Sequence, residues 1–281
     1  MIKLHYEAPA DTLAKTVSSF YRMDFEGEGF SELERADRAQ FRFQLRGNGS
    51  YRFSDGHVVD SYPVTIIGPT TSAVTAVANG PITIVGWGLL PAGWASLMGN
   101  EAEKWIDDAF DARRIFGDAV MDVHANLVAH GERAEQFAIA ATAAERIHEI
   151  GDTAPYEFTA KVDAWLLDGN DPDIDQLAHV TGLSARQLER TTKRYYGMPP
   201  KKLARKYRAL RAAQILAHGD SLDDSELGLA FYDQSHLIRE VKQFTGLTPT
   251  QLRSGASELT QMTMKGRRDL TGKVSGLISD S

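Results

Sequence analysis

The 281-residue sequence contains no cysteine. Without thiols, the chain cannot form a disulfide framework, a thiolate zinc site or a cysteine nucleophile. It also has no glycine-rich phosphate-binding loop and no nucleophile motif of the common hydrolase or kinase types. These absences favour a binding protein over an enzyme, and we expect no cofactor.

Long apolar runs are absent as well. The longest apolar stretch, from about Ile82 to Ala95, is interrupted by glycines and a proline, and it is too short to span a bilayer as a helix. No apolar run follows Lys3, so we predict no signal peptide. We expect a cytoplasmic protein that does not associate with a membrane.

Charge is distributed unevenly along the chain, whose formal net charge is −7. Residues 1–170 hold 14 basic and 25 acidic side chains, whereas residues 171–253 hold 13 and 10. Within residues 186–211 there are ten basic residues and one acid, Glu189. Such a basic run indicates either a solvated helix face or a surface that binds phosphates.

Apolar and polar residues alternate from about Phe41 to Val85, as in Phe41-Arg-Phe-Gln-Leu-Arg46 and Ile82-Thr-Ile-Val85. Turn-forming pairs such as Asp55-Gly56 separate these segments. Short strands at regular spacing predict a β-sandwich or β-barrel.

Apolar residues recur at helical spacing from near Glu101 to Ile150, and Trp105–Phe110 is the first predicted helical segment. We predict a hinge at residues 151–155, a helix at about 156–167 and a loosely packed polar tail at 254–281. The expected domains are residues 1–150, a linker with a helix at 151–172, a helical domain at 173–253, and the tail.

The helical domain contains an internal repeat. Residues 184–203 align with residues 233–252 at an offset of 49, with six identities in twenty positions, including Gly197 with Gly246 and Pro200 with Pro249. Shared helix-breaking residues indicate one supersecondary unit used twice.

Each copy predicts a helix, a turn and a second helix. In the first copy, Gly182 is suited to the turn, Ser184 caps the second helix and Gly197 ends it. In the second copy, Asp233 caps and Gly246 ends the corresponding helix. A helix at 201–218, about 27 Å long, joins the copies, so that one chain could present two helices to neighbouring DNA groove segments. The alternative is an all-α bundle with a solvated basic face.

At 174–253 the sequence resembles the AraC/XylS family. The resemblance lies in Asp175-Gln-Leu-Ala-His-Val-Thr-Gly-Leu-Ser-Ala-Arg-Gln-Leu-Glu-Arg190, Tyr196-Gly-Met-Pro-Pro-Lys201, Phe231-Tyr-Asp-Gln-Ser-His-Leu-Ile-Arg239 and Phe244-Thr-Gly-Leu-Thr-Pro249. It implies two helix-turn-helix units, joined by a linker helix, that act on double-stranded promoter DNA.

The family's groove-facing positions imply base contacts, which specify sequence. They fall on Arg186, Glu189, Arg190, Gln234, Ser235, His236 and Arg239. We expect a second set to contact phosphates: Lys193, Arg194, Lys201, Lys202, Lys242 and Thr248.

The second unit departs from the family pattern. Ala230 occupies the position of the usual turn glycine, and Ser225 and Glu226 replace a usual Ile-Ala pair. A buried, unpaired glutamate would be costly. We therefore expect the second unit to be less stable than the first, or rotated relative to it.

Family members often carry a ligand-sensing or dimerising cupin-like domain before the DNA-binding domain, and the Gly86–Trp94 stretch resembles a strand-to-helix join in one subgroup. The resemblance implies an α+β fold: an N-terminal cupin-like β-barrel with flanking helices, then the all-α domain. His57 is the only histidine in the strand region, whereas a metal-binding cupin needs two with a carboxylate, so we predict no metal. His57, Tyr62, Trp87 and Trp94 are candidates for a small-molecule pocket, or are simply core.

These observations predict a transcriptional regulator, an activator under the control of a small-molecule effector, with RNA polymerase as a partner. Helices between Glu101 and Ile150 either form a homodimer interface or cap the barrel. Two alternatives are a cupin-type enzyme with an accessory DNA-binding domain and an architectural or DNA-repair protein. Alkyl-transfer repair proteins with this kind of domain rely on cysteine, which the sequence lacks.

Overall fold

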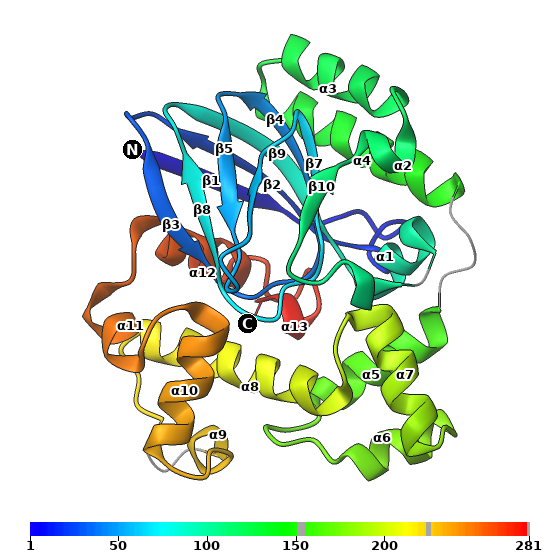
Figure 1. The fold of residues 1–281 in the computed structure, drawn as a ribbon, viewed down its shortest axis with the longest axis vertical. Helices are drawn as coiled ribbons and strands as arrows, with labels where there is room; N and C mark the ends of the chain where they lie inside the picture. Colours follow the sequence, from blue (N-terminus) through cyan, green and yellow to red (C-terminus); the bar gives the residue numbers. More distant parts are fainter. Residues whose placement is uncertain (100, 151–154, 223–225, 280–281) are drawn as a thin grey trace.

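The computed structural model describes residues 1–99, 101–150, 155–222 and 226–279. In Figure 1 a β-structured N-terminal part lies at the top and a helical part lies below it, and the helix at residues 258–268 returns to the sheets. The predicted α+β fold class is confirmed. Most of the expected hinge, residues 151–154, lies outside the described residues.

The larger sheet has six antiparallel strands in the order β1-β2-β9-β4-β7-β10. Their bounds are β1 Ile2–Glu7, β2 Val17–Phe25, β4 Gln40–Arg46, β7 Val64–Ile67, β9 Ile82–Leu89 and β10 Ala109–Asp111. Phe41 lies opposite Trp87, and their stacked rings have centroids 4.6 Å apart. The helix predicted at Trp105–Phe110 is wrong, because Phe110 instead pairs with Ile66 in an edge strand.

The smaller sheet has four strands in the order β3-β8-β5-β6. These are β3 Phe30–Glu34, β5 Gly49–Arg52, β6 Val58–Asp60 and β8 Val74–Ala78. Within the described ranges, no strand pairing joins this sheet to the larger one. The N-terminal part is therefore an open sandwich of two sheets and not the closed barrel that the resemblance implies.

Helices of different lengths cover the larger sheet. They are α1 Pro91–Met98, the 3-10 helix η1 Ala102–Lys104, α2 Arg113–Phe116, α3 Ala119–Ala129 and α4 Arg133–Ile150. Leu127 of α3 and Phe137 of α4 are buried in the same core as Trp87, so α3 and α4 cap the sheet. None of the helices described in the structure is long and apolar enough to cross a membrane.

The helical part has two cores connected by one long helix. Its helices are α5 Tyr156–Leu167, α6 Ile174–Thr181, α7 Ala185–Tyr196, α8 Pro200–Ala217, α9 Glu226–Leu229, α10 Gln234–Thr245 and α11 Pro249–Gly255. Leu203, near the start of α8, packs in the first core with Leu188. Leu216, near its end, packs in the second core with Val241. The predicted joining helix is confirmed.

The repeat positions Gly197 and Gly246 contact the N-terminal part. Each follows α7 or α10 with a φ of 76°, in the left-handed region that favours glycine. A Cβ at Gly197 would lie 2.3 Å from Ile106, and one at Gly246 would lie 2.9 Å from Leu33. Ala36 also donates a backbone hydrogen bond to Phe244 O at 2.6 Å. The N-terminal part therefore packs against the C-terminal ends of both repeated helices.

The expectation of a loosely packed tail is wrong. Ser257 caps α12, Glu258–Arg268, which packs on β1, and a further short helix, α13 Gly276–Ser279, follows. Leu259 and Arg267 are buried, and Arg267 pairs with Asp37. The tail is held by apolar contacts and by an ion pair to a residue 230 positions earlier, which local periodicity does not reveal.

Candidate nucleic-acid interface

The first helix-turn-helix unit consists of α6 and α7. Gly182 ends α6 with a φ of 69°, so the predicted turn glycine adopts the left-handed conformation. Ser184 and Gln187 form a capping box at the start of α7. These local interactions satisfy free amides at the helix start and fix the direction in which α7 leaves the turn.

Helix α7 is divided into an inner and an outer face. Leu188, Thr192 and Tyr196 are buried, as the helical period requires. The predicted base-contacting residues Arg186, Glu189 and Arg190 are all exposed. Glu189 pairs with Lys193 at 2.6 Å along the same helix. Lys193 is partly exposed and Arg194 is exposed.

The second unit has a different turn. Helix α9 spans only four residues, and Asp233 caps α10 by accepting from the His236 amide at 2.7 Å. Among the described non-glycine residues, only Asp107 has a positive φ, so Ala230 does not reproduce the left-handed turn. Of the other two departures, Ser225 and the side chain of Glu226 lie outside the described residues.

Helix α10 exposes Gln234, Ser235, Arg239 and Lys242, whereas Val241 and Phe244 are buried. His236 differs from the other predicted base-contacting residues. Its Nε2 lies 2.9 Å from Glu240 Oε1, and its Nδ1 accepts from the Tyr232 amide at 3.2 Å. Both ring nitrogens therefore have partners within the unit.

Glu240, only 1% exposed, is the centre of a set of ionic contacts that we name the Glu240 cluster. Arg205 Nε lies 2.5 Å from Glu240 Oε1, and Arg208 Nη2 lies 3.0 Å from Oε2, with His236 as the third partner. Burial raises the pKa of Glu240, but hydrogen bonds and charge from Arg205 and Arg208 outweigh it and hold the pKa below its usual value. Arg208 also pairs with Asp171 at 2.7 Å, which connects the cluster to the loop before α6.

The basic run at 186–211 faces solvent only in part. Lys206 is buried and donates to Asp37 O at 2.6 Å and Thr70 O at 2.9 Å, and burial lowers its pKa to about 7. Arg205 and Arg208 belong to the Glu240 cluster, and Arg211 donates to two backbone carbonyls. A solvated face and a phosphate-binding surface are therefore both incomplete interpretations of the basic run, because four of its ten cations hold parts of the protein together.

The remaining predicted phosphate contacts lie at helix starts. Lys201 is exposed and Lys202 partly exposed in the first turn of α8. Thr248 caps α11 and forms a capping box with Gln251. Its hydroxyl is already engaged at 3.0 Å from Gln251 Oε1, so a phosphate there would meet the backbone amides of the helix start.

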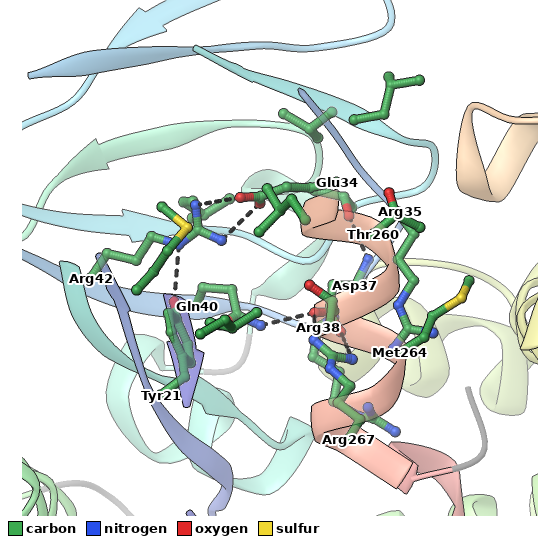
Figure 2. A pocket seen from close by; sticks show the side chains of 18 of the residues that line it. Tyr21, Glu34, Arg35, Asp37, Arg38, Gln40, Arg42, Thr260, Met264 and Arg267 are labelled. Carbon is green, nitrogen blue, oxygen red and sulfur yellow. Dashed lines mark hydrogen bonds and ion pairs between the residues drawn. The ribbon is translucent and has the colours of Figure 1, made fainter. Parts of the chain in front are cut away.

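The four candidate pocket residues are not brought together. Trp87 and Trp94 are fully buried in the sandwich core. The His57 ring stacks on Phe53, and its Nε2 lies 3.8 Å from Asp108. Tyr62 is partly exposed. A different cavity, between the sheets and α12 (Figure 2), is lined by charged residues that include Arg35, Arg42 and Arg267. Sequence reasoning missed it, although the dense charges of Glu34-Arg35-Ala36-Asp37-Arg38 within a β region were a signal.

No group of three or more metal-ligating side chains occurs among the residues that the structure describes.

The C-terminal part holds two helix-turn-helix units on one connecting helix. Comparison with known proteins gives the class of this part. The model of a helix-turn-helix domain family matches residues 177–255. The bifunctional transcriptional activator/DNA repair enzyme Ada of Escherichia coli K12 is 34% identical over 86 residues, which is 31% of this chain and 24% of Ada. The chain thus matches about a quarter of that relative's length.

Solved structures resemble a larger part of the chain, but at a lower sequence identity. The match to ToxT from Vibrio cholerae O395 covers 92% of this chain and 98% of the ToxT chain, with 8% identity and a TM-score of 0.48. The match to the AraC-like transcriptional activator CuxR covers 80% of this chain and 90% of the CuxR chain, with 11% identity and a TM-score of 0.34. The C-terminal region of this chain is an AraC-type helix-turn-helix domain.

Proposed function

We propose that the chain is a transcriptional regulator that binds double-stranded promoter DNA in a sequence-specific manner. One observation carries the proposal: α7 and α10 flank the two ends of α8 (Figure 1), and each turns a polar face with at least one arginine to solvent. Two exposed helices on one connecting helix suit two neighbouring stretches of major groove.

The side chains on these faces suit base edges. Arginine can donate two hydrogen bonds to guanine and glutamine can pair with adenine, which are the roles that we assign to Arg186, Arg190, Gln234 and Arg239. Ser235 can serve either base. Glu189 can accept from cytosine if its pair with Lys193 opens. His236 is the weakest candidate, because the Glu240 cluster and Tyr232 occupy its ring.

The phosphate contacts come from residues beside these faces. We assign Lys193, Arg194, Lys201, Lys202 and Lys242 to this role, with the start of α11 at Thr248 as an amide donor site. Because phosphate contacts carry no sequence information directly, they set the position of the protein on the duplex and make its affinity depend on salt.

The decisive experiment separates these two roles. Fragments bound by the full chain are first selected from a random DNA library, and affinity is then measured by fluorescence anisotropy at several salt concentrations. Arg190→Ala should weaken binding to the selected site by about 1–3 kcal/mol and relax the preference at one base position. Lys201→Ala should weaken binding to all sequences and reduce the salt slope by about one unit.

Lys3→Ala, which removes an exposed cation from β1, is the matched control and should change neither quantity. If Arg190→Ala and Lys201→Ala weaken binding to random DNA equally, the assignment of α7 as a reading helix is wrong. If the wild-type chain selects no sequence at all, the proposed function fails as a whole.

The finer features of this function are also proposals. Residues 173–253 would be the DNA-binding domain, 1–150 a regulatory and dimerisation domain controlled by a small-molecule effector, and 151–172 their linker. The name of the Escherichia coli relative includes transcriptional activator, which supports activation. Contact with RNA polymerase is part of the same proposal. That name also includes DNA repair, but thiol-based alkyl transfer has no counterpart in a sequence without cysteine.

A further inference from the structure

Tyr232 lies in the turn before α10 and is the most exposed large apolar or aromatic side chain in the described ranges. Of its surface, 93% is open to solvent, and Leu229 on the same turn is 77% exposed. Single exposed apolar residues are ordinary on a protein surface. Two on one turn, directly before the predicted base contacts Gln234 and Ser235, indicate that the turn meets a partner outside the chain.

The backbone of Tyr232 is held on both sides. Phe231 before it is buried in the second core, and Asp233 after it caps α10. The Tyr232 amide donates to His236 Nδ1 at 3.2 Å, which leaves His236 Nε2 to donate to Glu240 Oε1 at 2.9 Å. Because a tyrosine on a fixed backbone has few torsions left to order, a contact with its ring costs little conformational entropy.

Helices α7 and α10 both begin on the side of the molecule away from the β-sandwich. Gly197 and Gly246, at their ends, contact the N-terminal part, and the 12 residues of α10 extend about 18 Å from that contact. Figure 1 accordingly shows α9 and the start of α10 at the edge of the helical part that is farthest from the sheets. The first residues of a recognition helix are those that contact base edges in helix-turn-helix proteins, so Tyr232 would lie at the DNA.

The surroundings of Tyr232 favour an apolar contact over a phosphate. Tyr232 lines a groove between the two units, to which the first unit contributes three acids: Asp171, Asp173 and Asp175. Of the basic side chains that line this groove, Arg205 and Arg208 are paired within the Glu240 cluster, which leaves Lys201. The acids oppose a phosphate in the groove. An aromatic ring can instead pack on the C5-methyl group of thymine, which is exposed in the major groove.

We propose that Tyr232 reads a thymine in the half-site bound by α10, through contact of its ring with the C5-methyl group, and that His236 is the residue that positions it. The inference deepens the proposed function and rests on it. It also gives His236 a role, because the His236 ring is occupied within the Glu240 cluster and would act on DNA through Tyr232.

The test uses the full chain and the duplex selected from the random library, with affinity measured by fluorescence anisotropy. The half-site bound by α10 is the one whose base preference Arg239→Ala relaxes. Each thymine of that half-site is replaced in turn by deoxyuridine, which lacks only the methyl group. At one position this change should lower wild-type affinity about fourfold, as expected for one buried methyl group.

Tyr232→Ala should lower affinity for the thymine duplex at least about fourfold and should bind the thymine and deoxyuridine duplexes equally. Tyr232→Phe keeps the ring and should retain both the wild-type affinity and the thymine preference. Tyr156→Ala, at an exposed tyrosine of α5, is the matched control and should also keep that preference.

The positioning role of His236 has its own readout. His236→Ala frees the Tyr232 backbone and should reduce the thymine preference at that one position, while the preferences read by α7 stay unchanged. His236→Asn keeps an acceptor for the Tyr232 amide and should restore most of the preference. Arg205 and Arg208 still balance Glu240 in both variants, so both should fold, which thermal unfolding checks. An unchanged thymine preference in His236→Ala rejects the positioning role.

The inference is overturned if no thymine of that half-site is preferred over deoxyuridine, or if Tyr232→Ala keeps the wild-type preference. Equal weakening of all sequences by Tyr232→Phe would mean a phosphate contact through the hydroxyl, and a Tyr232→Ala chain that binds DNA normally but fails to regulate a reporter promoter would mean a protein partner; either result overturns it. A wild-type chain that selects a sequence without any methyl effect rejects only this contact, whereas one that selects no sequence rejects the proposed function together with it.

Discussion

The two helix-turn-helix units share a pattern but are held in place by different kinds of interaction. In the first unit, the Gly182 turn and the Ser184–Gln187 capping box position α7. In the second unit, α9 is a single turn, and the buried Glu240 cluster fixes α10 against α8. The first arrangement depends on neighbours in sequence, and the second depends on residues more than 30 positions away.

This difference shows how a duplicated motif can lose its local signals and keep its shape. The position equivalent to Glu240 in the first unit is Thr191, which is uncharged and only partly buried. We expected an unfavourable glutamate at position 226, in the helix before the turn. The acid that matters lies instead inside α10, where arginines satisfy it.

The largest expected effect comes from removing the acid at the centre of the second unit. Glu240→Ala leaves Arg208 buried without its main partner and should reduce the free energy of unfolding by about 3–5 kcal/mol. The matched change in the first unit, Glu189→Ala, breaks an exposed pair and should cost less than about 1 kcal/mol. Urea denaturation measures both, and equal losses would show that the two units are held alike.

A pH series should give an intermediate effect. The pKa of Glu240 is lowered in the folded protein, so its charge stabilises the fold fully above the unfolded pKa of about 4.3. That stability is lost as pH falls through the folded pKa. The difference in unfolding free energy between the wild type and Glu240→Gln should therefore be constant from pH 7 to about 5 and shrink in stronger acid. A difference that grows in acid would mean that the arginines do not stabilise the carboxylate.

A smaller effect than that of Glu240→Ala should come from the turn of the first unit. Gly182→Ala places a side chain at a φ of 69°, with nothing within 4 Å of the added Cβ. The cost is conformational only, about 1–2 kcal/mol. Thermal unfolding should show a small decrease in Tm, while Ala230→Gly, at a turn that does not use the left-handed conformation, should give no gain in stability. A gain from Ala230→Gly would mean that the second turn is strained.

Features set by neighbouring residues could be predicted from the sequence. The caps at Ser184, Asp233 and Thr248, the glycines that end α7 and α10, and the strands after Phe41 all follow from short-range patterns. The outer faces of α7 and α10 follow from the helical period. Six of the seven predicted base-contacting residues are exposed, and the seventh, His236, is partly exposed.

Features set by distant pairs could not be predicted. Lys206 is a cation in a basic run, and nothing local shows that it donates to carbonyls of Asp37 and Thr70. Strands β1 and β2, in contrast, were missed although they have a local signal: apolar Ile2, Leu4 and Tyr6 alternate with polar residues in β1, as Tyr21, Met23 and Phe25 do in β2. The cavity beside Arg35 needs a strand region and the C-terminal helix to meet, and only the fold brings them together.

In the proposed function, the two glycines that end α7 and α10 constrain the length of the DNA site. Because Gly197 packs against Ile106 and Gly246 against Leu33, the separation between α7 and α10 is set by the β-sandwich as well as by α8. A rigid separation admits one number of base pairs between two half-sites. One inserted pair moves the second half-site by about 3.4 Å along the duplex, and the DNA, as the more deformable partner, would have to twist or bend to restore contact.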